Sequence, residues 1–131
     1  MGDEVLGEFN VYANGITGTI PLEIGNLNQL AAFDVGKNDI TGTIPLGIGN
    51  LTQLEILRLY DNLLTGTIPQ NLFELPNLDD LDISFNKLNG TAPENFSKSP
   101  VEYLYMENNQ LTGTLPSIAA GQFPFLSECR R

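Results

Sequence analysis

Thr-Gly-Thr-Ile-Pro occurs three times in the chain, at residues 17–21, 41–45 and 65–69. Two variants follow, Asn-Gly-Thr-Ala-Pro at 89–93 and Thr-Gly-Thr-Leu-Pro at 112–116. The five prolines are therefore 24, 24, 24 and 23 residues apart. Five asparagines keep the same intervals: Asn14, Asn38, Asn62, Asn86 and Asn109. Two residue types that share one period predict an internal repeat, and a repeat of this length indicates stacked units.

The period divides the 131 residues into one domain of five repeats and a tail. The repeats are 6–29, 30–53, 54–77, 78–100 and 101–122, and the tail is 123–131. Each repeat opens on apolar residues such as Leu54, Leu57 and Leu59, and the last two alternate with period two. This alternation predicts a short strand. The later proline directs the chain away from the sheet into an irregular or one-turn helical return. No unit could bury its apolar face alone, so we expect one shared core.

The second repeat carries the pattern most clearly. It reads Leu30-Ala-Ala-Phe-Asp-Val-Gly-Lys-Asn-Asp-Ile-Thr-Gly-Thr-Ile-Pro-Leu-Gly-Ile-Gly-Asn-Leu51. Over residues 6–122 this pattern resembles the plant-type class of leucine-rich repeat. The resemblance implies an α/β, right-handed solenoid with a concave parallel β-sheet. It also implies a convex side of irregular or short helical segments, with a short second sheet near the Thr-Gly-Thr segments. The concave face of such solenoids binds ligands, usually proteins or peptides.

Two recurring residues and one irregular repeat lead to structural expectations. The repeated asparagine can satisfy inward-pointing backbone groups, because its amide carries two donors and an acceptor. The glycine of each Thr-Gly-Thr segment suits a position that is conformationally special or too crowded for a Cβ. Repeat 78–100 has Ala92 where isoleucine is expected and Ser99 near an expected leucine. We therefore expect looser packing in that repeat.

The composition excludes several functions. Lys and Arg total 6 and Asp and Glu total 16, so the net charge is −10. No cluster of cations is present to bind nucleic-acid phosphates or an anionic membrane surface. The chain has no histidine and one cysteine, Cys129. We therefore expect no catalytic residues, no metal site and no cofactor.

The sequence also carries neither a secretion signal nor a membrane-spanning stretch. Its ends carry no typical solenoid caps, although Phe123, Phe125 and Leu126 of the tail could cover the last repeat. We therefore expect the chain to be a fragment of a longer array and precursor.

Outward-facing strand positions are the candidates for ligand binding. Exposed tyrosine and arginine are typical of binding hot spots. The predicted ligand-binding residues are Tyr60 and Arg58, followed by Tyr105, Tyr103, Phe85, Asp82, Asp34 and Tyr12. Acidic residues outnumber Lys37 and Arg58 on this face, which favours a basic or aromatic-rich partner. Five strands give a planar patch of about 320 Å², below the ~800 Å² per partner of a standard interface. Binding is then weak, or the chain is part of a longer array.

Two further motifs have ordinary interpretations. Asn50-Leu-Thr, Asn89-Gly-Thr and Asn95-Phe-Ser fit the N-glycosylation acceptor. Three acceptors exceed the chance expectation of this composition only slightly, so they support secretion weakly. Asp79, Asp80 and Asp82 could suggest a calcium site, but we interpret them as a solvated acidic surface.

The leading hypothesis is a protein- or peptide-binding module of a receptor-like protein or receptor-like kinase. We expect it to be extracellular or at the cell surface and monomeric, with a co-receptor as a second candidate partner. We expect no binding to nucleic acid and no direct membrane contact. One alternative is a secreted inhibitor similar to the leucine-rich repeat inhibitors of cell-wall polygalacturonases. Another is a structural spacer array without a specific ligand.

Overall fold

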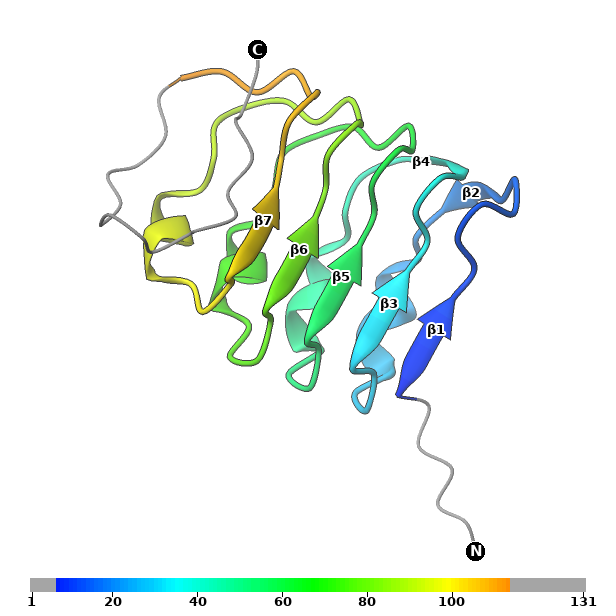
Figure 1. The fold of residues 1–131 in the computed structure, drawn as a ribbon, viewed down its shortest axis with the longest axis horizontal. Helices are drawn as coiled ribbons and strands as arrows, with labels where there is room; N and C mark the ends of the chain where they lie inside the picture. The colour runs from blue at the N-terminus through cyan, green and yellow to red at the C-terminus, as the bar shows by residue number, and fades with distance from the viewer. Residues whose placement is uncertain (1–6, 114–131) are drawn as a thin grey trace, which may run out of the picture.

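The computed structural model describes residues 7–113, which form a curved stack of coils (Figure 1). The concave side is a parallel sheet of three-residue strands: β1 (Glu8–Asn10), β3 (Ala32–Asp34), β5 (Ile56–Arg58), β6 (Asp80–Asp82) and β7 (Tyr103–Tyr105). Equivalent residues of neighbouring strands stand opposite each other, so Phe33, Leu57 and Leu81 form one inward-facing row. The row continues to Phe9 and Leu104 at the two ends of the sheet. The expected concave parallel sheet is confirmed.

A second, smaller sheet lies after the concave strands in each coil's course. Strand β2 (Thr17–Thr19) pairs in parallel with β4 (Asp39–Thr41). Single bridges between Thr43 and Thr65, and between Thr67 and Asn89, continue this pairing. The short second sheet implied by the Thr-Gly-Thr segments is therefore present.

The convex side consists of one-turn 3₁₀ helices, as the returns of each repeat predict. They are η1 (Leu22–Asn26), η2 (Leu46–Asn50), η3 (Gln70–Glu74) and η4 (Glu94–Lys98). A proline in extended conformation precedes each one. Proline suits this position because its ring fixes φ and its missing N–H would have no partner in the first turn. Apolar side chains between these turns and the concave sheet form one continuous core.

The repeated asparagines close the coils with side-chain hydrogen bonds. Asn62 is buried, and its Oδ1 accepts from the backbone N–H of Ile40 at 2.9 Å. Its Nδ2 donates to the carbonyl oxygens of Val35, Leu59 and Tyr60 at 3.0–3.2 Å. Asn38, Asn86 and Asn109 repeat the arrangement. Each amide thus satisfies backbone groups of its own coil and of the preceding one, as expected for a structural residue.

The glycine of the Thr-Gly-Thr segment meets both expected constraints. Gly42 has φ +82°, a left-handed conformation that glycine adopts without a steric penalty. A Cβ at Gly42 would also come within 2.8 Å of the Thr19 Cγ2 methyl. Gly66 repeats both features with Thr43. The methyl of each such threonine therefore lies over the glycine of the next coil.

Repeat 78–100 keeps buried side chains despite its two small residues. Phe96 is fully buried in η4, and its ring packs edge-on against Phe73 with the centroids 5.9 Å apart. Ser99 is buried too, and its hydroxyl accepts a hydrogen bond from the Val101 N–H at 3.2 Å. The hydrogen bond satisfies the Ser99 hydroxyl at a buried position where leucine is expected.

Candidate ligand-binding face

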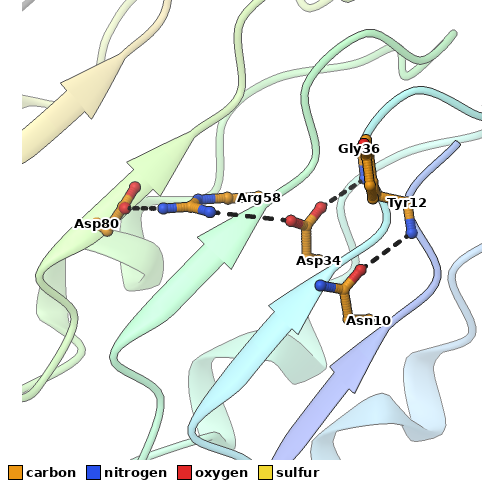
Figure 2. Close-up of polar contacts among 6 residues, drawn as sticks. All are labelled: Asn10, Tyr12, Asp34, Gly36, Arg58 and Asp80. Atoms are coloured by element: carbon orange, nitrogen blue, oxygen red, sulfur yellow. Dashed lines mark hydrogen bonds and ion pairs between the residues drawn. The ribbon is translucent and has the colours of Figure 1, made fainter.

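Arg58 lies at the centre of the concave sheet and contacts carboxylates of both neighbouring strands (Figure 2). Its Nη2 donates to Asp80 Oδ2 at 2.6 Å, and its Nη1 lies 4.0 Å from Asp34 Oδ2. The hydrogen bond to Asp80 is the main reason why the pKa of Arg58 is raised, with a smaller contribution from the charges of Asp34 and Asp82. The guanidinium therefore links three strands, β3, β5 and β6, and its position is fixed.

Asp82 stands directly opposite Arg58 in the register of β5 and β6. Its Oδ1 accepts hydrogen bonds from the backbone N–H and the hydroxyl of Ser84. Burial raises the pKa of Asp82, and the charges of Glu107 and Asp80 raise it further, whereas the Ser84 bonds lower it. Both ion pairs that the structure forms within residues 7–113 belong to Arg58, so Asp82 has no cationic partner there.

Three strands end in the same local turn. Asn10, Asp34 and Asp82 occupy the last strand position, and each side-chain Oδ1 accepts from the N–H two residues later. Figure 2 shows this bond for Asn10 with Tyr12 and for Asp34 with Gly36. Such a bond replaces the sheet ladder and turns the chain. The residue three positions after each concave strand then adopts a left-handed conformation. These residues are Ala13, Lys37, Asp61, Phe85 and Asn108, with φ between 54° and 58°.

The turn at Gly36 fixes Tyr60. A Cβ at Gly36 would overlap the Tyr60 ring, so the ring lies directly over that backbone. Burial there raises the pKa of Tyr60, with smaller effects from Asp34 and Tyr12. A glycine at this outward position leaves room for an aromatic ring from the next coil. The prediction of the binding residues did not use this signal.

A hollow of about 270 Å³ opens on the concave face beside Arg58. Its lining residues are Arg58, Tyr60, Asp80, Asp82 and Tyr105. We call this the concave hollow. Four of the predicted ligand-binding residues meet here, and a fifth, Asp34, is joined to them through Arg58. Asp80 belongs to the hollow although sequence reasoning did not include it among the binding residues.

The other three predicted residues do not line the hollow. Tyr103 is at the opposite end of β7 from Tyr105, in register with Asp80. Tyr12 and Phe85 lie beyond the ends of β1 and β6, and Phe85 has φ 54°. The strands are only three residues long, so extending the alternation to Phe85 wrongly placed it on the sheet. Its side chain is nevertheless 52% exposed.

The three glycosylation acceptors differ in their surroundings. Asn50 and Asn89 are exposed. Asn95 is half-buried: its Nδ2 donates to the Gln70 carbonyl at 3.1 Å, and its Oδ1 is buried without a partner among the described residues. The tail 123–131, with Phe123, Phe125, Leu126 and Cys129, lies outside the described residues.

No group of three or more acidic or cysteine side chains in residues 7–113 is arranged to hold a metal ion. No helix in the same range is long and apolar enough to cross a membrane.

Comparisons with known proteins agree with this repeat fold. Residues 52–111 match the leucine rich repeat family. The leucine-rich repeat ectodomain of the receptor kinase SOBIR1 from Arabidopsis thaliana is 31% identical, with a TM-score of 0.72. That match covers 88% of this chain and 69% of the ectodomain. This chain belongs to the plant-type leucine-rich repeat family.

Two further solved structures bear on the function of this leucine-rich repeat chain. The plant peptide hormone receptor RGFR1, solved in complex with RGF2, is 40% identical over 76% of this chain, with a TM-score of 0.74. A plant ice-binding protein is 39% identical over 72% of this chain and 31% of its own length, with a TM-score of 0.70. The chain spans only 13–18% of several receptor structures that it matches, RGFR1 included at 16%. A comparison with curated protein sequences gives no significant match.

Proposed function

We propose that this chain is a peptide- or protein-binding module of a receptor-like protein, and that the ligand binds the concave face. The observation that carries the proposal is the concave hollow. Arg58 is fixed there between Asp34 and Asp80, and Tyr60 is held by the turn at Gly36. Tyrosine and arginine side chains that are already ordered lose little entropy on binding, which makes them effective hot spots.

The related ectodomains support peptide and co-receptor partners. RGFR1 is described as a peptide hormone receptor in complex with RGF2. BIR3 and SERK2 from Arabidopsis thaliana form a complex, and that match is 31% identical over 90% of this chain with a TM-score of 0.78. We propose the same classes of partner for this chain: a peptide on the concave face and a second ectodomain as co-receptor. The domain is proposed to be monomeric, with five repeats over residues 6–122.

The proposed location is extracellular or at the cell surface, as part of a longer precursor. The ectodomain relatives support this location. The exposed acceptors Asn50 and Asn89 are the proposed glycosylation sites in this setting. A glycan on either asparagine would not displace a side-chain hydrogen bond of the described fold.

Selection from a displayed random-peptide library tests the proposed function. We expect selected peptides to lose about tenfold or more in affinity for Tyr60→Ala and Arg58→Ala. Leu46→Ala is the matched control, because Leu46 is 68% exposed in η2 on the convex side. Peptides that depend on Leu46 and not on Tyr60 or Arg58 would overturn the proposed face. Failure to select any peptide would favour the spacer array, and inhibition of a polygalacturonase would favour the inhibitor.

The second sheet supports a second candidate function, binding to ice. Its threonines are exposed and repeat from coil to coil, with the Thr19 and Thr43 methyls over Gly42 and Gly66. The hydroxyls of Thr41 and Thr65 donate to the carbonyls of the preceding glycines at 3.3 Å. Parallel coils about 4.8 Å apart thus present a regular array of methyls and hydroxyls. The similarity to a plant ice-binding protein favours testing this array.

Inhibition of ice recrystallisation tests this second candidate. We expect Thr65→Lys to abolish inhibition, because a charged side chain would interrupt the array. Arg58→Ala, on the concave sheet, should leave inhibition unchanged. A wild-type chain without any inhibition would eliminate this candidate and leave the receptor-type proposal unaffected.

A further inference from the structure

We propose that the concave hollow binds one cationic side chain, arginine or lysine, of a peptide ligand, with Asp82 as its counter-ion. The inference rests on the proposed function and specifies the chemistry of the ligand. It is carried by the placement of charges around the hollow, by the aromatic side chains at its rim and by its size.

The charges of the hollow are unbalanced. Arg58 is engaged by Asp80 at 2.6 Å and by Asp34 at 4.0 Å. Asp82 lies opposite Arg58 but forms neither of the two ion pairs found in residues 7–113. Three carboxylates therefore surround one guanidinium. A ligand cation would be attracted to the excess negative charge, whereas a ligand anion would meet a guanidinium already bound to carboxylates.

Asp82 is oriented for such a contact. Both of its hydrogen bonds, from the N–H and the hydroxyl of Ser84, go to Oδ1. Its Oδ2 receives no hydrogen bond from the described part of the chain. Because the carboxylate is half-buried, leaving it without a cation is unfavourable, and its raised pKa agrees with this. A ligand ammonium or guanidinium would remove this cost on binding.

The aromatic residues and the volume fit a single side chain. Tyr60 and Tyr105 belong to the lining of the hollow, and a cation near a tyrosine ring is attracted to its face. A volume of about 270 Å³ is below the ~300–1,000 Å³ of pockets that enclose whole small molecules. The hollow therefore suits the end of one peptide side chain, while the rest of the peptide would lie along the sheet.

Titration of the ¹⁵N-labelled chain with Ac-Gly-Arg-Gly-NH₂, followed by NMR, tests the inference. We expect saturable shifts of the amides of Arg58–Tyr60, Asp82–Ser84 and Tyr105. Ac-Gly-citrulline-Gly-NH₂ has nearly the same shape without the charge, and it should bind about tenfold more weakly or not at all. Asp82→Asn should weaken arginine binding by about tenfold or more. Asp39→Asn, in the exposed second sheet, is the charge-matched control and should bind like the wild type.

Four results would overturn the inference: no saturable shift, equal binding of the citrulline peptide, unchanged binding by Asp82→Asn, or shifts confined to another face. Asp82→Asn can keep the Ser84 turn, and its dispersed spectrum would show that it folds. Tyr105→Ala provides a second variant with the same expected loss of binding. The library selection keeps the two proposals apart. Selected peptides that need Tyr60 but ignore Asp82 would refute the cation site and leave the binding face intact.

Discussion

The guanidinium of Arg58 pairs diagonally with Asp80, at 2.6 Å, rather than with Asp82, which stands directly across from it in the adjacent strand. The diagonal pair leaves the half-buried Asp82 carboxylate near other acids, with hydrogen bonds from Ser84 alone in the described structure. Its hydrogen bonds from Ser84 hold the turn after β6, but the partial burial of a charge without an ion-pair partner costs stability. Functional sites often retain groups that cost stability.

Replacing Asp82 should separate stability from binding. The pKa of Asp82 is raised mainly by burial, so the folded state binds its proton more tightly than the unfolded state does. The contribution of Asp82 to stability is therefore full below the ordinary carboxyl pKa and is lost as pH rises through the raised value. At pH 7 we expect Asp82→Asn to be more stable than the wild type, by less than about 1 kcal/mol after solvent screening.

Urea unfolding of both proteins across the pH range checks this prediction. The difference in unfolding free energy should shrink as the pH falls, because a protonated aspartate resembles asparagine. Asp39→Asn should show no comparable gain, since Asp39 is exposed. A less stable Asp82→Asn at pH 7 would show that the carboxylate supports the fold.

The asparagine column should respond to substitution according to burial. Asn62→Ala removes four hydrogen bonds and leaves backbone groups of two coils unpaired. We expect a loss of ~3 kcal/mol in unfolding free energy. Asn14→Ala should cost less, because Asn14 is exposed and its amide donates only within its own coil. Chemical unfolding measures the free energy of unfolding of both variants. Equal losses for Asn62→Ala and Asn14→Ala would contradict the prediction that the cost follows burial. Asn28, exposed and without a side-chain bond in the described structure, is the neutral control.

Gly36→Ala should weaken peptide binding without replacing any side chain of the concave hollow. The added methyl would displace the Tyr60 ring from its position over the turn. We expect selected peptides to lose affinity to an extent approaching Tyr60→Ala, and the Tyr60 ring resonances to shift. Gly7→Ala is the control, because a Cβ at Gly7 meets nothing within 4 Å. Unchanged affinity and unchanged Tyr60 resonances in Gly36→Ala would show that the ring is not held there.

Glycan occupancy should follow the exposure of the three acceptors. In a secreting eukaryotic host we expect glycans on Asn50 and Asn89, with Asn95 unoccupied in the folded protein. Asn95→Gln should also cost about 1 kcal/mol of stability, because it removes the bond to the Gln70 carbonyl. Asn50→Gln and Asn89→Gln should be within about 0.5 kcal/mol of the wild type. Peptide mass spectrometry of the folded fraction measures the glycan occupancy of each acceptor. Full occupancy at Asn95 would refute the prediction.

The periodic features of this chain could be predicted from its sequence, and the local contacts could not. The row through Leu57 and the structural asparagines follow from the 24-residue period, whereas the second sheet was implied by the resemblance to plant-type leucine-rich repeats. Strand β6 ends where Asp82 accepts the hydrogen bond of the Ser84 N–H, a local contact that hydrophobic alternation does not encode. For the same reason Phe85 was wrongly placed on the sheet. Likewise, the alignment alone could not indicate that the Phe96 ring packs edge-on against Phe73.

Part of the lining of the concave hollow could be predicted from the sequence, but the contacts among its residues could not. Tyrosine and arginine on outward positions indicated the binding face, and Arg58, Tyr60, Asp82 and Tyr105 do line one hollow. The partner of Arg58 depends on side-chain conformation across three strands. Sequence alone could not choose among Asp34, Asp80 and Asp82. That choice determines which carboxylate remains for a ligand.

The central claim is that the ligand occupies the concave face. The most direct test is an amide chemical-shift map of the ¹⁵N-labelled chain with a peptide selected from the displayed library. We predict perturbations in β3, β5, β6 and β7, centred on Arg58 and Tyr60, and none confined to η1–η4 or the second sheet. A map centred on the 3₁₀ turns or on the threonines of the second sheet, with the concave strands unperturbed, would contradict the account.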